Sequence, residues 1–209
     1  MKIAILLYDE MTGLDALGPY EVLSRLPGAE LRFVAETRGE VRTDTRALGI
    51  LADAALDEVD AVDLVLVPGG PGDARVRERR AVLEWLRAVD EATRFTTSVC
   101  TGSLILGAAG LLEGRRATTH WAQLDELRRY GAEPVQGRYV RDGKHWTAAG
   151  VSAGIDMALG LAAEIAGDDY ARMLQLGIEY DPAPPFDCGA PEKAPTHLVE
   201  LVRGTLTRS

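Results

Sequence analysis

Residues 95–103 have the sequence Phe95-Thr96-Thr97-Ser98-Val99-Cys100-Thr101-Gly102-Ser103. The segment before Cys100 is rich in β-branched and aromatic side chains, which favours a buried strand. The segment from Thr101 to Leu112 favours a helix that ends near Gly114 and whose small residues allow close packing. Cys100 stands at the junction and has small residues, Ser98 and Gly102, two positions away on each side. The sharp turn of a nucleophile elbow requires this pattern, because larger side chains would collide there.

The rest of the chain repeats this alternation of strand and helix. Apolar strands are predicted at 2–8, 30–35, 63–68 and 116–119, helices at 19–26, 74–91, 121–130, 152–166, 168–180 and 195–206, and hairpin or edge strands at 41–53, 134–140 and 144–149. Near-continuous apolar strands between helices predict an α/β three-layer sandwich, in which a mostly parallel sheet has helices on both faces. We expect a single domain over 1–209, with 181–209 a proline-rich extension that packs on the domain or on a partner subunit.

Composition narrows the classes of partner and the compartment. The net charge of −9 disfavours nucleic acid and anionic membranes, because both require a basic face. The arginines at 75–80 alternate with other residues on a predicted helix and indicate a solvated face. No apolar stretch approaches membrane-spanning length, and the two cysteines, Cys100 and Cys188, lie in different contexts. We therefore expect a cytoplasmic protein with free thiols, in which Cys188 is incidental.

Three loops follow the carboxyl ends of predicted parallel strands, where ligands bind in such sheets. One of them contains Asp15, a candidate to exchange a proton with Cys100, although a structural role in a local turn is the alternative. The second contains Gly69 and Gly70, whose backbone N–H groups are candidates for an anion hole together with the amides around Cys100 and Thr101. The third loop contains Cys100. The dipole of the helix predicted from Thr101 would favour a Cys100 thiolate near neutral pH. The alternative for Cys100 is an inert, buried thiol.

His120 is the one histidine expected near this site, where it would contact the substrate or serve as a structural residue. His145 and His197 have no clustered partners. The three histidines do not have the spacing of metal ligands, so we predict no metal.

Several longer blocks resemble the ThiJ/PfpI superfamily, and bacterial isocyanide hydratases in particular. These blocks are Leu14-Asp15 with Gly18-Pro19, Pro68-Gly69-Gly70, 98–112, Arg116 to Trp121 and Tyr180 to Phe186. The resemblance covers residues 2 to about 200. It implies a flavodoxin-like fold and a cofactor-independent homodimer in which Cys100 attacks the isocyanide carbon, and water then opens the thioimidate to an N-substituted formamide.

Carried over by position, the resemblance makes Asp15 the acid/base group, Thr101 a helper and Gly70 a substrate contact. Thr101 stands where peptidase-like members have a histidine, and Asp15 where redox and glyoxalase-like members have a glutamate. Both departures argue against protease, deglycase or glyoxalase activity.

A binding module is the competing class. The Cys100-Thr101-Gly102 and Thr118 to Trp121 blocks also resemble the N-terminal sensor domains of AraC-type regulators. We expect no DNA-binding domain here, because the sequence ends at Ser209 and is acidic. A small-molecule or oxidative-stress sensor without that domain is the alternative function. Catalytic turnover of an isocyanide distinguishes the two classes.

Overall fold

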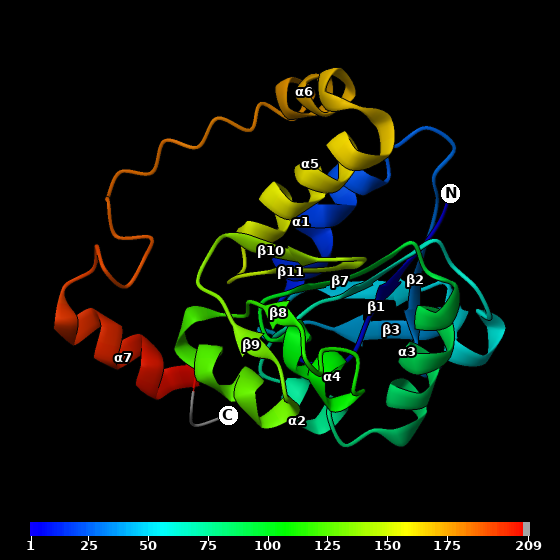
Figure 1. The fold of residues 1–209 in the computed structure, drawn as a ribbon, viewed down its shortest axis with the longest axis horizontal. Coiled ribbons are helices and arrows are strands. Elements are labelled where there is room, and N and C mark those ends of the chain that lie inside the picture. The colour runs from blue at the N-terminus through cyan, green and yellow to red at the C-terminus, as the bar shows by residue number, and fades with distance from the viewer. Residues whose placement is uncertain (207–209) are drawn as a thin grey trace.

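A seven-stranded sheet forms the centre of the protein in a computed structural model, which describes residues 1–206 (Figure 1). Its strand order is β10-β11-β7-β6-β1-β2-β5, and every neighbouring pair is parallel except β10 and β11. The strands of this sheet are β1 (Lys2–Leu6), β2 (Glu30–Ala35), β5 (Ala54–Ala55), β6 (Leu64–Val67), β7 (Phe95–Val99), β10 (Tyr139–Asp142) and β11 (His145–Ala148). Two further pairs lie outside it: β3 (Gly39–Arg42) with β4 (Gly49–Ala52), and β8 (Arg116–Ala117) with β9 (Glu133–Pro134).

Helices cover both faces of the sheet, which confirms the predicted three-layer α/β fold. One layer holds α1 (Gly13–Leu23), α5 (Ala153–Ala166) and α6 (Asp168–Gly177). The other holds α2 (Asp73–Val76), α3 (Arg80–Ala92) and α4 (Gly102–Ala108), with the 3-10 helices η1 (Leu56–Glu58) and η2 (Trp121–Tyr130) beside them. The central strands β6 and β7 are buried along their whole length, as expected for strands covered on both faces.

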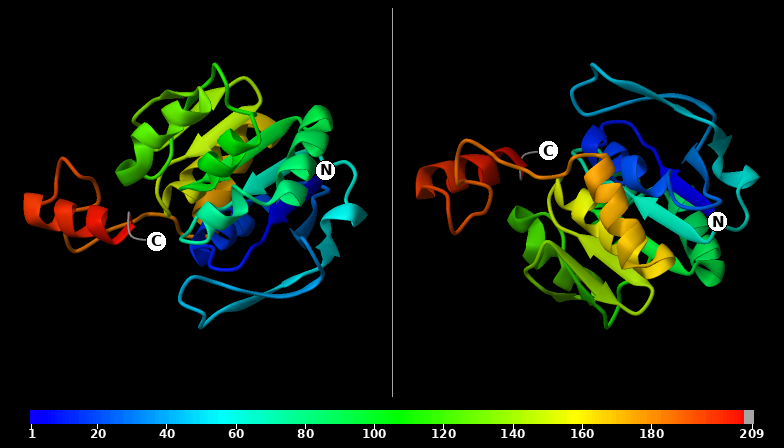
Figure 2. Two further views of the ribbon diagram at one scale, coloured as in Figure 1. Left: turned by 90° about the horizontal axis from the view of Figure 1, so that it is seen from below. Right: turned by 90° about the horizontal axis from the view of Figure 1, so that it is seen from above.

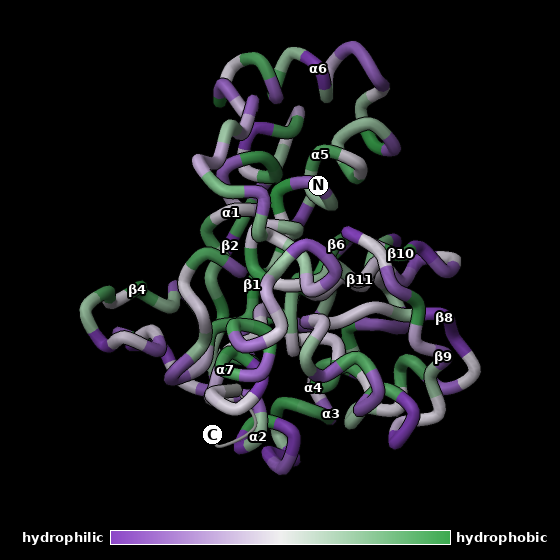
Figure 3. Tube along the Cα trace, turned by 90° about the vertical axis from the view of Figure 1, so that its left-hand side faces the viewer, coloured by the Kyte–Doolittle hydropathy of each residue, from purple (hydrophilic) through white to green (hydrophobic). Residues whose placement is uncertain are grey.

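Hairpins form at both expected places, but the predicted strand at 134–140 is wrong, because β10 covers Tyr139–Asp142 and Glu133–Pro134 form β9. β3 pairs antiparallel with β4 and projects from the body (Figure 3), and β10 pairs with β11 through the turn that contains Gly143. Gly143 has a φ of 61°, which explains why the Asp-Gly signal located this turn correctly.

Four predicted helices are wrong in their bounds. The helix predicted over 101–112 ends at Ala108, and the one predicted over 168–180 ends at Gly177. The first helix begins at Gly13, not at Pro19, so Asp15 lies in its first turn and Pro19 in its interior. Gly18 is small because a Cβ there would lie 3.0 Å from Ile155 of α5. The Gly18-Pro19 pair therefore serves close packing between α1 and α5 and does not mark a helix start.

The predicted helix over 74–91 is two helices, α2 and α3, interrupted at 77–79. Arg77 forms an ion pair with Asp73, one helical turn earlier, and Arg79 pairs with Glu36 just after β2.

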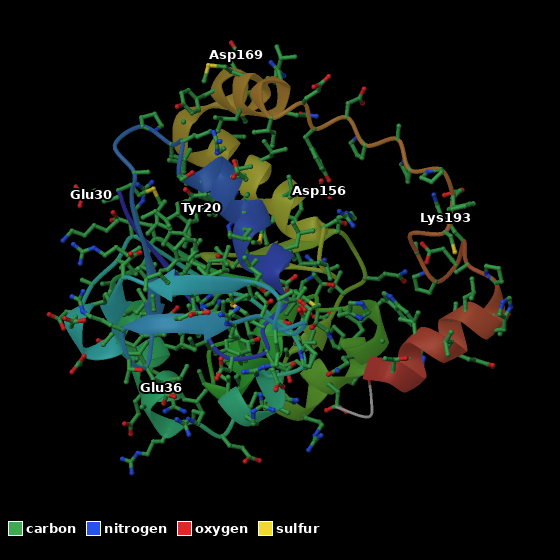
Figure 4. The ribbon with its side chains drawn as sticks, turned by 180° about the vertical axis from the view of Figure 1, so that it is seen from behind. Tyr20, Glu30, Glu36, Asp156, Asp169 and Lys193 are labelled. Carbon is green, nitrogen blue, oxygen red and sulfur yellow. The ribbon has the colours of Figure 1, made fainter. Side chains whose placement is uncertain are left out.

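The segment after α6 leaves the body as an extended arm, which then forms α7 (Thr196–Leu206) (Figure 2). The arm is fixed at its start because the Tyr180 hydroxyl donates to Asp156 of α5 at 2.8 Å; Asp156 and, farther along the arm, Lys193 are labelled in Figure 4. At its far end the guanidinium of Arg203 lies over the Trp121 ring, 5.4 Å from its centroid. Residues 207–209 of the predicted extension lie outside the described residues. Among residues 1–206, no helix combines the length and the apolar character that crossing a membrane requires.

Candidate functional site

Cys100 occupies the sharp turn between β7 and α4, as the sequence predicts. Its φ of 56° lies in the left-handed region, which is strained for a residue with a side chain. Hydrogen bonds hold the turn: the Cys100 N–H lies 3.1 Å from the carbonyls of Ala148 and Ala149, and its own carbonyl accepts from Thr119 at 2.8 Å. Gly102 is required because a Cβ would lie 2.1 Å from the Val67 carbonyl oxygen.

Asp15 is the carboxylate beside Cys100, and its side chain is fully buried. Its Oδ2 accepts from the Gly69 N–H at 2.9 Å, so it links α1 to the loop after β6 and does not cap a local turn. Its Oδ1 has no hydrogen-bond partner at ordinary geometry. Burial raises the pKa of Asp15 from 3.8 to about 7, although the Gly69 N–H and the Cys100 side chain favour the ionised form.

The expected Cys100 thiolate is not what this environment favours. Burial, followed by the negative charge of Asp15, raises the pKa of the Cys100 thiol well above its ordinary value. The N–H groups of Thr101 and Val151 hydrogen bond to the side chain and favour the thiolate, but they do not compensate for desolvation. The helix terminus does not outweigh burial here, because Cys100 is only 6% exposed. The resting site therefore holds a thiol beside a carboxyl group that titrates near neutrality.

The two glycines after β6 do not provide the expected free amides. The Gly69 N–H donates to Asp15, and the Gly70 N–H donates to the Thr101 hydroxyl at 3.0 Å. Both positions require glycine for a different reason, namely close approach of backbone. A Cβ would lie 2.4 Å from the Thr101 nitrogen at Gly69, and 2.4 Å from the Thr12 nitrogen at Gly70.

Val151 supplies a backbone N–H at Cys100, the role that we expected of Gly69 and Gly70. It follows β11 and has a φ of 22°, which is strained for a β-branched residue. This backbone directs its N–H to Cys100. Val151 carries no motif that would have identified it. Its neighbour Gly150 is small because a Cβ there would lie 2.4 Å from the His120 ring.

His120 lies at the site, at the start of η2. Its Nδ1 accepts from the Ala122 N–H at 3.3 Å, which assigns the ring proton of the neutral imidazole to Nε2. Burial lowers the pKa of His120, so the neutral form prevails at pH 7.

A cavity of about 70 Å³ opens onto Cys100. The cavity is lined by side chains and backbone from five loops: Thr12, Gly70, Pro71, Cys100, Thr101, His120, Gln123 and Val151. The structure thus brings Cys100, Thr101, Gly70 and His120 to one cavity, with Asp15 and Gly69 directly behind it. Thr12, Pro71 and Gln123 carried no motif that would have identified them.

Larger hollows lie elsewhere but offer no comparable chemistry. One of about 390 Å³ lies between the β3 hairpin region and α2, and its arginines are ion-paired, Arg75 with Glu10 and Arg79 with Glu36. Within residues 1–206, no group of three His, Cys, Asp or Glu side chains is placed to hold a metal ion.

Comparison with known proteins places this site in context. Residues 1–164 match the model of the DJ-1/PfpI family. The chain is 44% identical to an isonitrile hydratase of Pseudomonas putida, over 97% of this chain and 89% of that protein. The crystal structure of a ThiJ/PfpI family protein from Pseudomonas syringae superposes with a TM-score of 0.96 at 37% identity, covering 99% of this chain and 86% of that one. The HTH-type transcriptional regulator CdhR of Pseudomonas aeruginosa is 30% identical over 78% of this chain, which spans only 49% of the regulator.

Proposed function

Because this chain belongs to the DJ-1/PfpI family, we propose that it is a cofactor-independent isocyanide hydratase, with Cys100 as its nucleophile. The observation that carries the proposal is the buried pair of Cys100 thiol and Asp15 carboxyl group behind a small cavity. The similarity to an isonitrile hydratase over nearly the whole chain supports it.

The first step forms a covalent adduct. The Asp15 carboxylate takes the thiol proton while the Cys100 sulfur attacks the terminal carbon of the isocyanide. Asp15 then gives that proton to the same carbon. The product is a thioimidate, Cys100–S–CH=N–R, which contains every atom of the thiol and of the isocyanide.

The second step adds water to the thioimidate carbon. One water proton moves to nitrogen, the carbon–sulfur bond breaks, and the other proton returns to the sulfur through Asp15. The products are the free Cys100 thiol and HC(=O)–NH–R. In this scheme Thr101 assists, and Gly70 and His120 contact the substrate, while Gly69 acts by holding Asp15.

A ligand sensor is the second candidate, favoured by the similarity to the regulator CdhR over 78% of this chain. Both candidates would bind a small molecule at Cys100. A sensor would bind or become oxidised stoichiometrically, whereas a hydratase would turn over many equivalents.

We also propose that the chain forms one domain, works in the cytoplasm and assembles as a homodimer. The arm supports the dimer because it exposes apolar side chains that a second copy would cover: Phe186 is 77% exposed and Leu201 is 66% exposed. Analytical ultracentrifugation of the intact chain and of Leu201→Glu tests this, and a monomeric wild type would refute the dimer.

The deciding experiment follows the loss of an alkyl or aryl isocyanide and the appearance of the formamide. Wild type should turn over many equivalents, Cys100→Ala should turn over none, and Asp15→Asn should be slower by about 10²- to 10⁴-fold. Cys188→Ala is the matched cysteine control and should match wild type, because Cys188 is exposed on the arm. An inert wild type would refute the hydratase and favour the sensor.

A further inference from the structure

A second buried carboxylate, Asp73, lies behind Thr101 and has no role in the chemistry described above. Asp73 begins α2 and is only 4% exposed. Its Oδ1 accepts from Arg77 Nη2 at 3.0 Å, and Arg77 also donates to the Tyr130 hydroxyl at 3.3 Å. Its Oδ2 is buried and has no hydrogen-bond partner at ordinary geometry. Burial raises the pKa of Asp73, whereas the neighbouring Thr101 hydroxyl and the Arg77 charge favour its ionised form.

The Thr101 hydroxyl connects Asp73 to the cavity. A hydroxyl group has one proton and two lone pairs. One lone pair of Thr101 accepts from the Gly70 N–H at 3.0 Å. An ionised carboxylate can only accept, so Asp73 draws the Thr101 proton toward itself. The remaining lone pair is left for the cavity, which Thr101 lines.

We propose that Asp73, held by Arg77, is a positioning residue that fixes the Thr101 hydroxyl as a hydrogen-bond acceptor for the water that opens the thioimidate. This inference rests on the proposed hydratase function and assigns Thr101 to its second step. The water donates one O–H to Thr101 Oγ while its oxygen adds to the thioimidate carbon. Its protons then move to nitrogen and, through Asp15, to the departing sulfur, so the atoms balance without any further reactant.

The position of Arg77 supports this arrangement. The guanidinium reaches Asp73 because the two residues are one helical turn apart, and it donates to Oδ1. Oδ2 is left without a hydrogen-bond partner at ordinary geometry, which leaves it available to the neighbouring Thr101 hydroxyl. An ion pair that served only stability would not require one carboxylate oxygen to be buried without a firm partner, since such an atom costs free energy.

Asp73→Asn tests the polarity of this hydrogen bond. The introduced amide oxygen would continue to accept from Arg77, which places the NH₂ group at the position of Oδ2. That group donates, so the Thr101 proton would turn toward the cavity and no longer receive the water. We expect the addition of isocyanide to Cys100 to persist and the hydrolysis to slow by about 10- to 1000-fold. Rapid quench and intact-protein mass spectrometry should then show accumulation of an adduct whose added mass equals that of the isocyanide.

Matched variants separate positioning from folding. Thr101→Val should accumulate the same adduct, Thr101→Ser should not, and Asp73→Asn with Thr101→Val should be no worse than Thr101→Val alone. Asp44→Asn removes another carboxylate of the site region, one that accepts from Thr12 at 3.0 Å, and should not raise the adduct level. Thermal unfolding of each variant checks the fold, and the two Thr101 variants still decide the matter if Asp73→Asn does not fold.

Three results would overturn the inference. Equal slowing of adduct formation and hydrolysis in Asp73→Asn would assign Asp73 a general structural role. Multiplying defects in the double variant would show that Asp73 and Thr101 act independently. Absence of adduct in Thr101→Val would remove Thr101 from the water step. An inert wild type is a separate outcome, because it refutes the hydratase function itself.

Discussion

Asp15→Asn should make the protein more stable while it removes the proposed base. The folded state binds the Asp15 proton more tightly than the unfolded state, because burial raises the pKa from 3.8 to about 7. The contribution of Asp15 to the free energy of unfolding therefore falls as pH rises from about 4 to about 7, and it no longer changes above pH 7. The neutral amide is free of this penalty, and its oxygen can still accept from the Gly69 N–H.

The pKa shift sets an upper limit to the gain. At 1.36 kcal/mol per unit, it amounts to roughly 4 kcal/mol at pH 8 and roughly 1.5 kcal/mol at pH 5. For a domain of this size, the gain at pH 8 corresponds to an increase in Tm of up to about 16 °C. The stabilised variant should nevertheless lose isocyanide turnover.

Thermal unfolding at pH 5 and pH 8 checks this prediction, with Asp125→Asn as the control. The Asp125 side chain is 93% exposed, so that variant should leave Tm nearly unchanged at both pH values. The reasoning is refuted if Asp15→Asn is no more stable than wild type at pH 8, or if its advantage is the same at both pH values.

Three further predictions concern the same site. In a Cys188→Ser background, alkylation of Cys100 by iodoacetamide should be slow at pH 7 and rise only above about pH 9, since burial raises the pKa of this thiol; a midpoint below about 8 in the rate-against-pH curve would contradict this. Gly69→Ala should cost on the order of 1–3 kcal/mol, measured by urea unfolding, because its Cβ would lie 2.4 Å from the Thr101 nitrogen, whereas Gly137→Ala meets nothing closer than 3.6 Å; equal costs would show that the loop yields. Tyr8→Phe should cost about 1–3 kcal/mol, since the buried Tyr8 hydroxyl donates to the Pro68 carbonyl at 2.9 Å; an unchanged unfolding midpoint would mean that this carbonyl finds another donor.

The order of the elements could be predicted from the sequence because their signals are local. The apolar run at 64–67 and the small residues around Cys100 fix the strand and the elbow by periodicity and steric requirement alone. The break between α2 and α3 could not be predicted in this way. At the break Arg79 pairs with Glu36, a partner 43 positions away in the sequence, and no local pattern announces such a contact.

The same distinction applies to the site. Cys100, Asp15 and Gly70 could be proposed as neighbours because each follows a parallel strand at the same edge of the sheet. The protonation state of Cys100 could not be predicted from the sequence, because burial is a property of the assembled fold. Here burial outweighs the local effect of the helix terminus. The direction of the Gly69 N–H was missed for a related reason. Its acceptor is Asp15, whose helix begins earlier than the Gly-Pro pair suggested.

The protonated thiol suits the proposed reaction better than a preformed thiolate would. Addition to an isocyanide places both the sulfur and a proton on the same carbon. A thiolate that had already lost its proton to solvent would need another proton before the carbon could be protonated. In this site the proton stays on Cys100 until an electrophile arrives, and Asp15, with a pKa of about 7, can accept it and release it again near neutral pH. The burial that makes Cys100 a poor general nucleophile thus favours a reaction in which nucleophile and proton are delivered together.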